Sequence, residues 1–318
     1  MYKRFYNLQR NPFEITPDPS FLFTTRRHNE ALATLYYGVR RHKGFVVLTG
    51  EVGTGKTLLI RSLLQILKLS NVHYAYVFNS RLGSMEFLQY VAGDFRLPIA
   101  GKSKSELLLE LSSFVISRFK KGLTTVLVVD EAHHLAEEVL EEIRLLTNLE
   151  TSEEKLLQIL LVGQPELDEK LDLVNLRQLK QRIALRSQLC ALELEETEGY
   201  IRRRMQVAGN ANSDELFPFE TVLEIQRQSR GIPRLINTLC ENALIYGYAR
   251  QATKLTPQMI EEIASDFRLN IVRSASTEPT VSGESSKDVA QAAKTLLDLY
   301  ASLRQAQSIG EELRGVVR

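Results

Sequence analysis

The sequence is poor in cysteine and has no long apolar segment. Its two cysteines, Cys190 and Cys240, lie in apolar stretches of sequence and lack the spacing of metal ligands. We therefore expect reduced core residues rather than disulfides or a zinc site. The longest apolar runs, such as residues 126–129 and 159–162, have the length of strands, whereas a membrane-spanning helix needs ~20 residues. The N-terminus lacks the apolar core of a secretory signal. We therefore predict a cytoplasmic protein without a transmembrane segment; peripheral attachment at the inner membrane through a partner stays open.

The chain also has no excess of charge of either sign. It contains 40 basic and 39 acidic residues among 318, and 44% of its residues are hydrophobic. This balance is that of an ordinary globular protein, and it gives no argument for a polyanionic partner such as nucleic acid. The length allows a main domain with one or two smaller ones.

Apolar strand candidates alternate with helical periodicity through the first part of the chain. This alternation predicts an α/β fold, in which helices cover both faces of a parallel sheet. From about residue 195 onward, periodic helices dominate and Pro or Gly marks several boundaries, which predicts a smaller all-helical domain. The strand candidates are residues 44–50, 72–78, 124–129 and 156–162.

A glycine-rich loop follows the first strand candidate. Residues 50–57 match the pattern G-x-x-x-x-G-K-[ST] and stand between a strand and a helix, as phosphate binding requires. The glycines let backbone N–H groups close around phosphate oxygens, and the opening helix adds its positive end. We expect Lys56 to reach the β and γ phosphates of ATP, and the Thr57 hydroxyl to ligate Mg²⁺. The predicted ATP-binding residues are Gly50, Glu51, Val52, Gly53, Thr54, Gly55, Lys56 and Thr57.

Two carboxylates follow the strand candidate that ends at residue 129. Ligands of open α/β sheets bind beside the carboxyl ends of the strands. We therefore expect Asp130 to hold the Mg²⁺ shell and Glu131 to orient and partly deprotonate the attacking water. The alternative is that both residues only cap the next helix. The string Asp-Glu-Ala-His is also a helicase signature, but a helical second half leaves no room for a second RecA-like domain. His133 and His134 are expected to be partly exposed at the start of that helix; a polar contact near the γ-phosphate is the alternative.

Further polar residues follow later elements. Gln164 comes after the strand candidate 156–162, where its amide would contact water or the γ-phosphate; capping of its own loop is the alternative. Arg177, Arg182 and Arg234 are candidates for stabilising transition-state charge, which makes oligomerisation useful because a neighbouring subunit can supply such an arginine. Solvated helix faces are the alternative for all three.

With these motifs placed, the chain resembles the AAA+ ATPases, and within them the general secretion pathway protein A group, over roughly residues 1–270. The resemblance implies that Gln164 occupies the sensor-1 position, Arg182 the arginine-finger position and Arg234 the sensor-2 position. Secretion-type members continue into a membrane span and a peptidoglycan-binding domain, and this sequence has neither motif, so we expect a shorter relative at an envelope or exopolysaccharide export locus. Beyond residues 50–57 and 130–132, the motifs that carry the resemblance are Phe5-Tyr6, Asn11-Pro12-Phe13, Thr16-Pro17-Asp18-Pro19, His28, Gly44-Phe45, Gly163-Gln164-Pro165-Glu166-Leu167, Gln181-Arg182-Ile183 and Gly231-Ile232-Pro233-Arg234-Leu235-Ile236-Asn237.

Five parts are predicted along the chain. An N-terminal segment packed at the ATP site (1–43) precedes the AAA+ α/β nucleotide-binding domain (44–194) and a helical lid (195–272). A Ser-rich flexible linker (273–287) lacks core-forming residues, and an amphipathic helix (288–318) closes the chain. Self-association, partner docking and folding back onto its own domain are all open for that helix.

Two functions from different classes follow. The favoured one is an oligomeric, Mg²⁺-dependent ATPase that drives assembly or remodelling of an envelope secretion or polysaccharide-export partner. The alternative is a DNA-binding ATP switch of the transposition target-selection type; the near-neutral charge weakens it, and the run 202–204 is its local basic patch. A third option, a nucleotide switch with negligible turnover, is disfavoured by Glu131.

Overall fold

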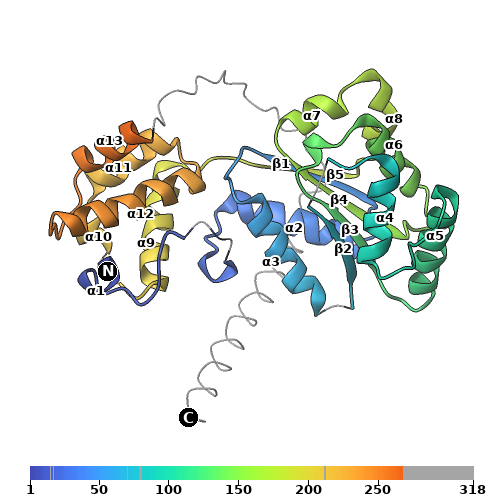
Figure 1. Cartoon of the computed structure of the whole chain (residues 1–318), viewed down its shortest axis with the longest axis horizontal. Coiled ribbons are helices and arrows are strands. Elements are labelled where there is room, and N and C mark those ends of the chain that lie inside the picture. The colour runs from blue at the N-terminus through green and yellow to red at the C-terminus, as the bar shows by residue number, and fades with distance from the viewer. Residues whose placement is uncertain (15, 17, 70, 79–80, 211–212, 268–318) are drawn as a thin grey trace, which may run out of the picture. The chain divides into compact units, whose positions relative to one another are not determined.

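The computed structural model describes residues 1–267, with the exception of residues 15, 17, 70, 79–80 and 211–212. The predicted linker and C-terminal helix, residues 273–318, therefore lie outside the described residues. The described chain forms two compact units, whose elements are labelled in Figure 1. Residues 26–50 and 59–188 form the sheet unit, and residues 1–25, 51–58 and 189–267 form the helical unit. The domain boundaries proposed from the sequence stay predictions.

The sheet unit is built on five strands in the order β2-β3-β4-β1-β5. The strands β2, β3, β4 and β1 run parallel, and their registers pair Val77 with Val129, Val129 with Leu161, and Thr49 with Gly163. The carboxyl ends of β1, β3 and β4 therefore share one edge of the sheet, which is where ligands bind in open α/β folds. The strands are β1 (Phe45–Gly50), β2 (His73–Val77), β3 (Thr125–Val129), β4 (Leu157–Gly163) and β5 (Leu185–Leu189).

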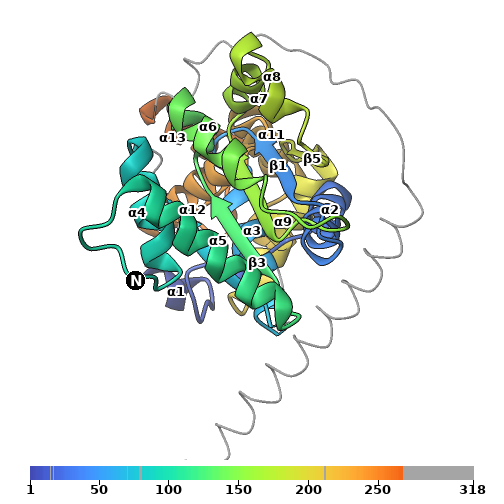
Figure 2. The same ribbon diagram turned by 90° about the vertical axis from the view of Figure 1, so that its right-hand side faces the viewer.

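Helices cover both faces of this sheet. On one face, alternate strand residues such as Val47, Leu127 and Leu161 share a buried core with α4, α5 and α6, which gather on one side of the sheet in Figure 2. On the other face α2 lies so close to β1 that a Cβ on Gly38 would be 2.7 Å from Val46 Cγ2. The predicted parallel sheet with flanking helices is confirmed. The helical elements are α2 (Arg26–Arg40), α3 (Lys56–Lys68), α4 (Ser84–Asp94), α5 (Lys104–Lys120), η2 (Ala132–His134), α6 (Glu137–Leu146), α7 (Glu166–Leu171), η3 (Val174–Leu176) and α8 (Arg177–Lys180).

The helical unit confirms the predicted helical second half. Pro233 and Pro257 occupy the first turns of α12 and α13, where a missing N–H costs nothing. The hydroxyl of Thr256 caps α13 by accepting a hydrogen bond from the Met259 N–H. The elements of this unit are α1 (Tyr2–Phe5), η1 (Pro19–Phe21), α9 (Leu194–Val207), α10 (Ser213–Leu216), α11 (Phe219–Ser229), α12 (Pro233–Ala249) and α13 (Pro257–Asp266).

The N-terminal residues contribute to the core of the helical unit. Tyr2, Tyr6 and Phe13 are buried in the same cluster as apolar residues of α9, α11, α12 and α13. The buried guanidinium of Arg204 donates to the Pro12 carbonyl at 2.8 Å, which ties this segment to α9. The predicted place of the segment at the ATP site stays a prediction.

The scarcity of cysteine and of long apolar segments in the sequence can be compared with the structure. Both cysteines are free thiols; Cys240 is buried and Cys190 partly exposed. Within the part of the chain that the structure describes, no helix combines the length and the apolar character that a membrane crossing needs.

Candidate nucleotide-binding and hydrolysis site

The glycine-rich loop leads from the end of β1 into α3. Gly53 and Gly55 have φ angles of 84° and 99°, a backbone region that glycine enters without strain. The hydroxyl of Thr54 and the ammonium of Lys56 both donate to the Glu51 carbonyl, at 2.8 and 3.0 Å. Lys56 is only 6% exposed. Its charge therefore lies against the loop that is predicted to hold the phosphates.

The start of α12 packs against the same loop. The Arg234 backbone N–H donates to the Gly53 carbonyl at 3.2 Å. A Cβ on Gly53 would lie 2.6 Å from Arg234 Cβ and 3.1 Å from Ile232 Cγ2, so glycine is required there by contact as well as by its φ angle. Arg234, which was singled out in the sequence, is thus beside the loop, and it is exposed. Its part in the reaction stays a prediction.

Asp130 comes directly after β3 and is buried, with 5% of its surface exposed. The hydroxyl of Tyr76 on β2 donates to its Oδ2 at 2.6 Å, and the Glu131 N–H donates to its Oδ1 at 2.9 Å. Burial raises the pKa of Tyr76 and the neighbouring Asp130 carboxylate raises it further, so the phenol stays protonated and keeps donating. Two donors therefore fix this carboxylate at the carboxyl edge of the sheet.

Glu131 adopts an unusual backbone conformation. Its φ and ψ of 52° and 35° are left-handed, which costs a residue with a side chain roughly 1–2 kcal/mol. Non-glycine residues held in this region cluster at functional sites, where the surrounding structure imposes them. The Oε2 atom of Glu131 is buried and makes no hydrogen bond to the described residues. The carboxylate thus has an acceptor atom left for an external partner.

His133 lies between Glu131 and Gln164. Its Nδ1 accepts a hydrogen bond from the Gln164 backbone N–H at 3.4 Å and is 3.6 Å from Glu131 Oε2. The imidazole is only 6% exposed, whereas the adjacent His134 is exposed and lies against it, with ring centroids 4.0 Å apart. His133 therefore links the ends of β3 and β4, a contact that the sequence does not predict because only the fold brings the two strand ends together.

The donor atoms can be compared with the metals they suit. Asp130 and Thr57, the predicted Mg²⁺ ligands, offer a carboxylate and a hydroxyl oxygen, and hard oxygen donors are what Mg²⁺ prefers. The ligand atoms of Glu131, His133 and His134 lie within 4.8 Å of one another, but two imidazoles suit transition metals rather than Mg²⁺. The oxygen set is therefore the one that fits the expected ion.

The part of the chain that carries these residues is similar to known proteins. Residues 39–171, which contain both motifs, match the AAA domain family. Over 256 residues the chain is 44% identical to general secretion pathway protein A of Aeromonas hydrophila. That alignment covers 80% of this chain and 46% of the relative, so the chain spans less than half of the length of that protein.

Solved structures show the same fold at low sequence identity. ORC2 of Aeropyrum pernix, in its ADPNP–ADP complexes, superposes with a TM-score of 0.59 and 18% identity over 83% of this chain and 75% of its own. For Cdc6p of Pyrobaculum aerophilum the values are 0.58 and 17%, over 78% and 70% of the two chains. The chain is an AAA+ protein. Its fold is that of a nucleotide-hydrolysing ATPase, and its sequence is similar to general secretion pathway protein A.

The arginines of this AAA+ protein differ in how they are engaged. Arg182, the predicted finger, follows α8 and is partly exposed, and Arg177 at the start of α8 is exposed. In the run 202–204, Arg202 pairs with Glu198 and Asp214, while Arg204 is buried as described above. A basic patch made by this run is therefore largely committed to contacts within the helical unit.

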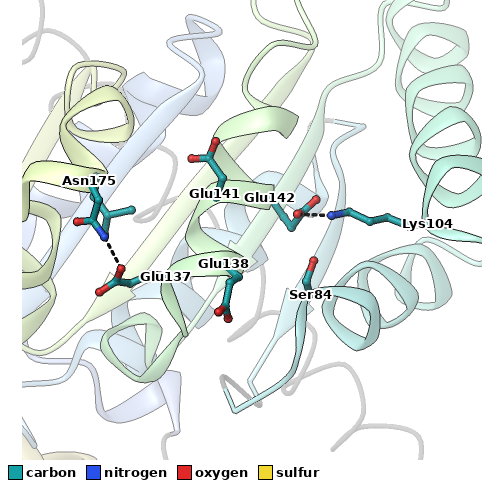
Figure 3. Close-up of a pocket in the computed structure, with 8 residues that line it drawn as sticks. Ser84, Lys104, Glu137, Glu138, Glu141, Glu142 and Asn175 are labelled. Carbon is teal, nitrogen blue, oxygen red and sulfur yellow. Dashed lines mark hydrogen bonds and ion pairs between the residues drawn. The ribbon is translucent and has the colours of Figure 1, made fainter.

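A cavity of about 590 Å³ lies elsewhere in the sheet unit of the AAA+ protein. Its lining carries four glutamates of α6, and Figure 3 shows the Lys104 ammonium reaching Glu142, whose Oε1 accepts its hydrogen bond at 2.5 Å. The amide of Asn175 donates to Glu137 on the opposite side. None of the predicted ATP-site residues lines this cavity. The excess of carboxylates over the single lysine makes its wall unfavourable for a polyanion. The lining residues are Ser84, Lys104, Glu137, Glu138, Glu141, Glu142, Asn175 and Leu176.

Proposed function

We propose that the protein binds ATP with Mg²⁺ and hydrolyses it as a homo-oligomer, and that this cycle drives assembly or remodelling of an envelope secretion or polysaccharide-export system. The observation that supports the proposal is the position of Glu131 after the buried strand β3. The strand β1, which continues into the phosphate-binding loop, ends at the same edge of the sheet. A glutamate at this point can orient and deprotonate an attacking water, which hydrolysis needs and nucleotide binding alone does not. Its buried acceptor oxygen is suited to holding a water molecule.

The residues divide the chemistry between them. The loop at residues 50–57 holds the phosphates, and Lys56 adds a positive charge to them. Thr57 and Asp130 hold Mg²⁺, which when bound neutralises charge on the β and γ phosphates. Glu131 orients the attacking water and accepts its proton, and Gln164 contacts the water or the γ-phosphate.

Two arginines complete the site in this proposal. Arg182 reaches the γ-phosphate of a neighbouring subunit, for which its partial exposure leaves it accessible. Arg234 senses the nucleotide from within the chain, because its backbone is hydrogen-bonded to the loop at Gly53. The need for a second subunit's arginine is the reason to expect a homo-oligomer.

The biological setting rests on the relative named for the general secretion pathway. We infer a cytoplasmic protein that works peripherally at the inner membrane through an envelope-export partner. The DNA-binding alternative has less support, because the run 202–204 is engaged in internal contacts and the cavity of the sheet unit is acidic.

The test is light scattering coupled to size exclusion on the Glu131→Gln protein, with and without Mg·ATP and with duplex DNA in a parallel run. We expect assembly with Mg·ATP alone, since the variant keeps the nucleotide and the neighbouring arginine can reach it. The Lys56→Ala protein is the control and should stay unassembled. Assembly only in the presence of DNA would replace this proposal with the DNA-binding switch.

A further inference from the structure

We propose that His133 is a positioning residue for the Glu131 carboxylate and couples it to the segment that carries Gln164. The inference rests on the proposed function, in which Glu131 activates the attacking water. The proposal is based on one ring nitrogen, Nδ1 of His133, which lies 3.6 Å from Glu131 Oε2 and 3.4 Å from the Gln164 backbone nitrogen.

Nδ1 cannot accept a hydrogen bond from Gln164 and donate one to Glu131 at the same time. Because the Gln164 N–H donates to Nδ1, Nδ1 carries no proton in this arrangement, and in the neutral ring the proton is on Nε2. Nδ1 then faces the Glu131 carboxylate as a second acceptor, which disfavours closer approach and leaves Oε2 without a hydrogen bond. In the other tautomer Nδ1–H would donate to Glu131 and hold it, at the expense of the bond from Gln164. The two hydrogen bonds therefore exclude each other.

The backbone around His133 is fastened to the segment that follows Gln164. The ammonium of Lys170, on α7, donates to the His133 carbonyl at 2.6 Å and to the Leu135 carbonyl at 2.8 Å. Lys170 and Gln164 belong to the same stretch at the end of β4, so a shift of that stretch moves His133 with it. The left-handed backbone of Glu131 persists only where the surrounding structure imposes it, and His133 is part of that surrounding structure. A displacement at Gln164 is in this way transmitted to Glu131.

The kinetic test compares three variants by steady-state phosphate release and by calorimetric ATP binding. His133→Ala should lower kcat by about tenfold to a hundredfold, the cost of misplacing a reacting group by about 1 Å, while KM and the Kd for ATP stay within about twofold. His133→Asn places a polar atom at the position of Nδ1 and should recover most of the loss. His134→Ala, which removes the exposed neighbouring ring, is the matched control and should turn over like the wild type.

Two results would overturn the proposal: turnover of His133→Ala within about twofold of the wild type, or His133→Asn as slow as His133→Ala with the same loss of thermal stability. A readout that needs no hydrolysis is nitrogen-15 NMR of histidine-labelled protein. It should show Nδ1 of His133 unprotonated, and a proton on Nδ1 would contradict the inference. If the wild type itself released no phosphate, the proposed function would fail, and the NMR result would still decide the arrangement of His133.

Discussion

The phosphate-binding loop and the acidic edge of the sheet hold their functional groups by different means. In the loop the backbone conformation positions the functional groups: Gly53 and Gly55 have positive φ angles, and α12 packs directly on Gly53. At the acidic edge, side chains from neighbouring strands do it, since Tyr76 fixes Asp130 and His133 lies against Glu131. A site that is formed by the backbone is specified by one short sequence motif. A side-chain-built site depends on residues that only the fold brings together.

Removal of the loop's charge should have the largest effect on nucleotide binding. The Lys56→Ala protein should bind ATP about tenfold to a hundredfold more weakly, because a charge-assisted bond to phosphate contributes roughly 1.5–3 kcal/mol. Isothermal titration calorimetry measures this directly. The control is Lys68→Ala, which removes the same side chain at the exposed end of the same helix. Equal affinities of the two variants would show that Lys56 does not touch the phosphates.

A methyl group added to the loop backbone should act mainly on stability, with a smaller effect on ATP binding than the loss of Lys56. Gly53→Ala meets both a positive φ angle and a contact of 2.6 Å with Arg234 Cβ, and together these should cost roughly 2–4 kcal/mol of stability. Gly101→Ala is the matched control because Gly101 has a φ of 71° and nothing within 4 Å. Thermal unfolding and ATP titration of both proteins separate the contact from the φ angle. If Gly101→Ala is as unstable as Gly53→Ala, the contact with α12 contributes nothing.

Loss of a single hydroxyl at the acidic edge should have the smallest effect. Tyr76→Phe leaves Asp130 with one donor fewer and should cost about 1–3 kcal/mol of unfolding free energy, with turnover lowered a few-fold. Because folding raises the pKa of Tyr76, its contribution is complete below the ordinary tyrosine pKa and is lost as the pH rises above it. Urea unfolding at neutral and at strongly alkaline pH checks both points. Tyr74→Phe, on the same face of β2, should be nearly neutral, and an equal loss there would refute the specific role of Tyr76.

The same contrast explains how much the sequence predicted. The strands β1, β3 and β4 were predicted within a few residues because they are continuous apolar runs buried on both faces, and β2, which is only partly buried, was also found within a few residues. The fifth strand, Leu185–Leu189, was missed, because its exposed and partly buried residues alternate at the end of the sheet order and form no apolar run. Short elements such as α7 and α8 left no periodicity to detect.

The site was predicted unevenly for the same physical reason. The loop and the Asp130–Glu131 pair are visible because their chemistry needs residue types at fixed spacing. The bond from Tyr76 to Asp130 and the contacts of His133 with Glu131 and Gln164 could not be predicted, since they cross between strands that only the fold brings together. Arg204 shows the converse: a cation in a basic run is buried, with its guanidinium over the Tyr200 ring and hydrogen-bonded to the Pro12 carbonyl.

The most direct test of the account is the Glu131→Gln protein, measured for ATP binding by calorimetry and for turnover by phosphate release beside the wild type. The substitution keeps the shape of the side chain and removes the base, so binding should be unchanged while turnover falls by at least about a hundredfold. Turnover at the wild-type rate would contradict the role of Glu131 and with it the proposed function.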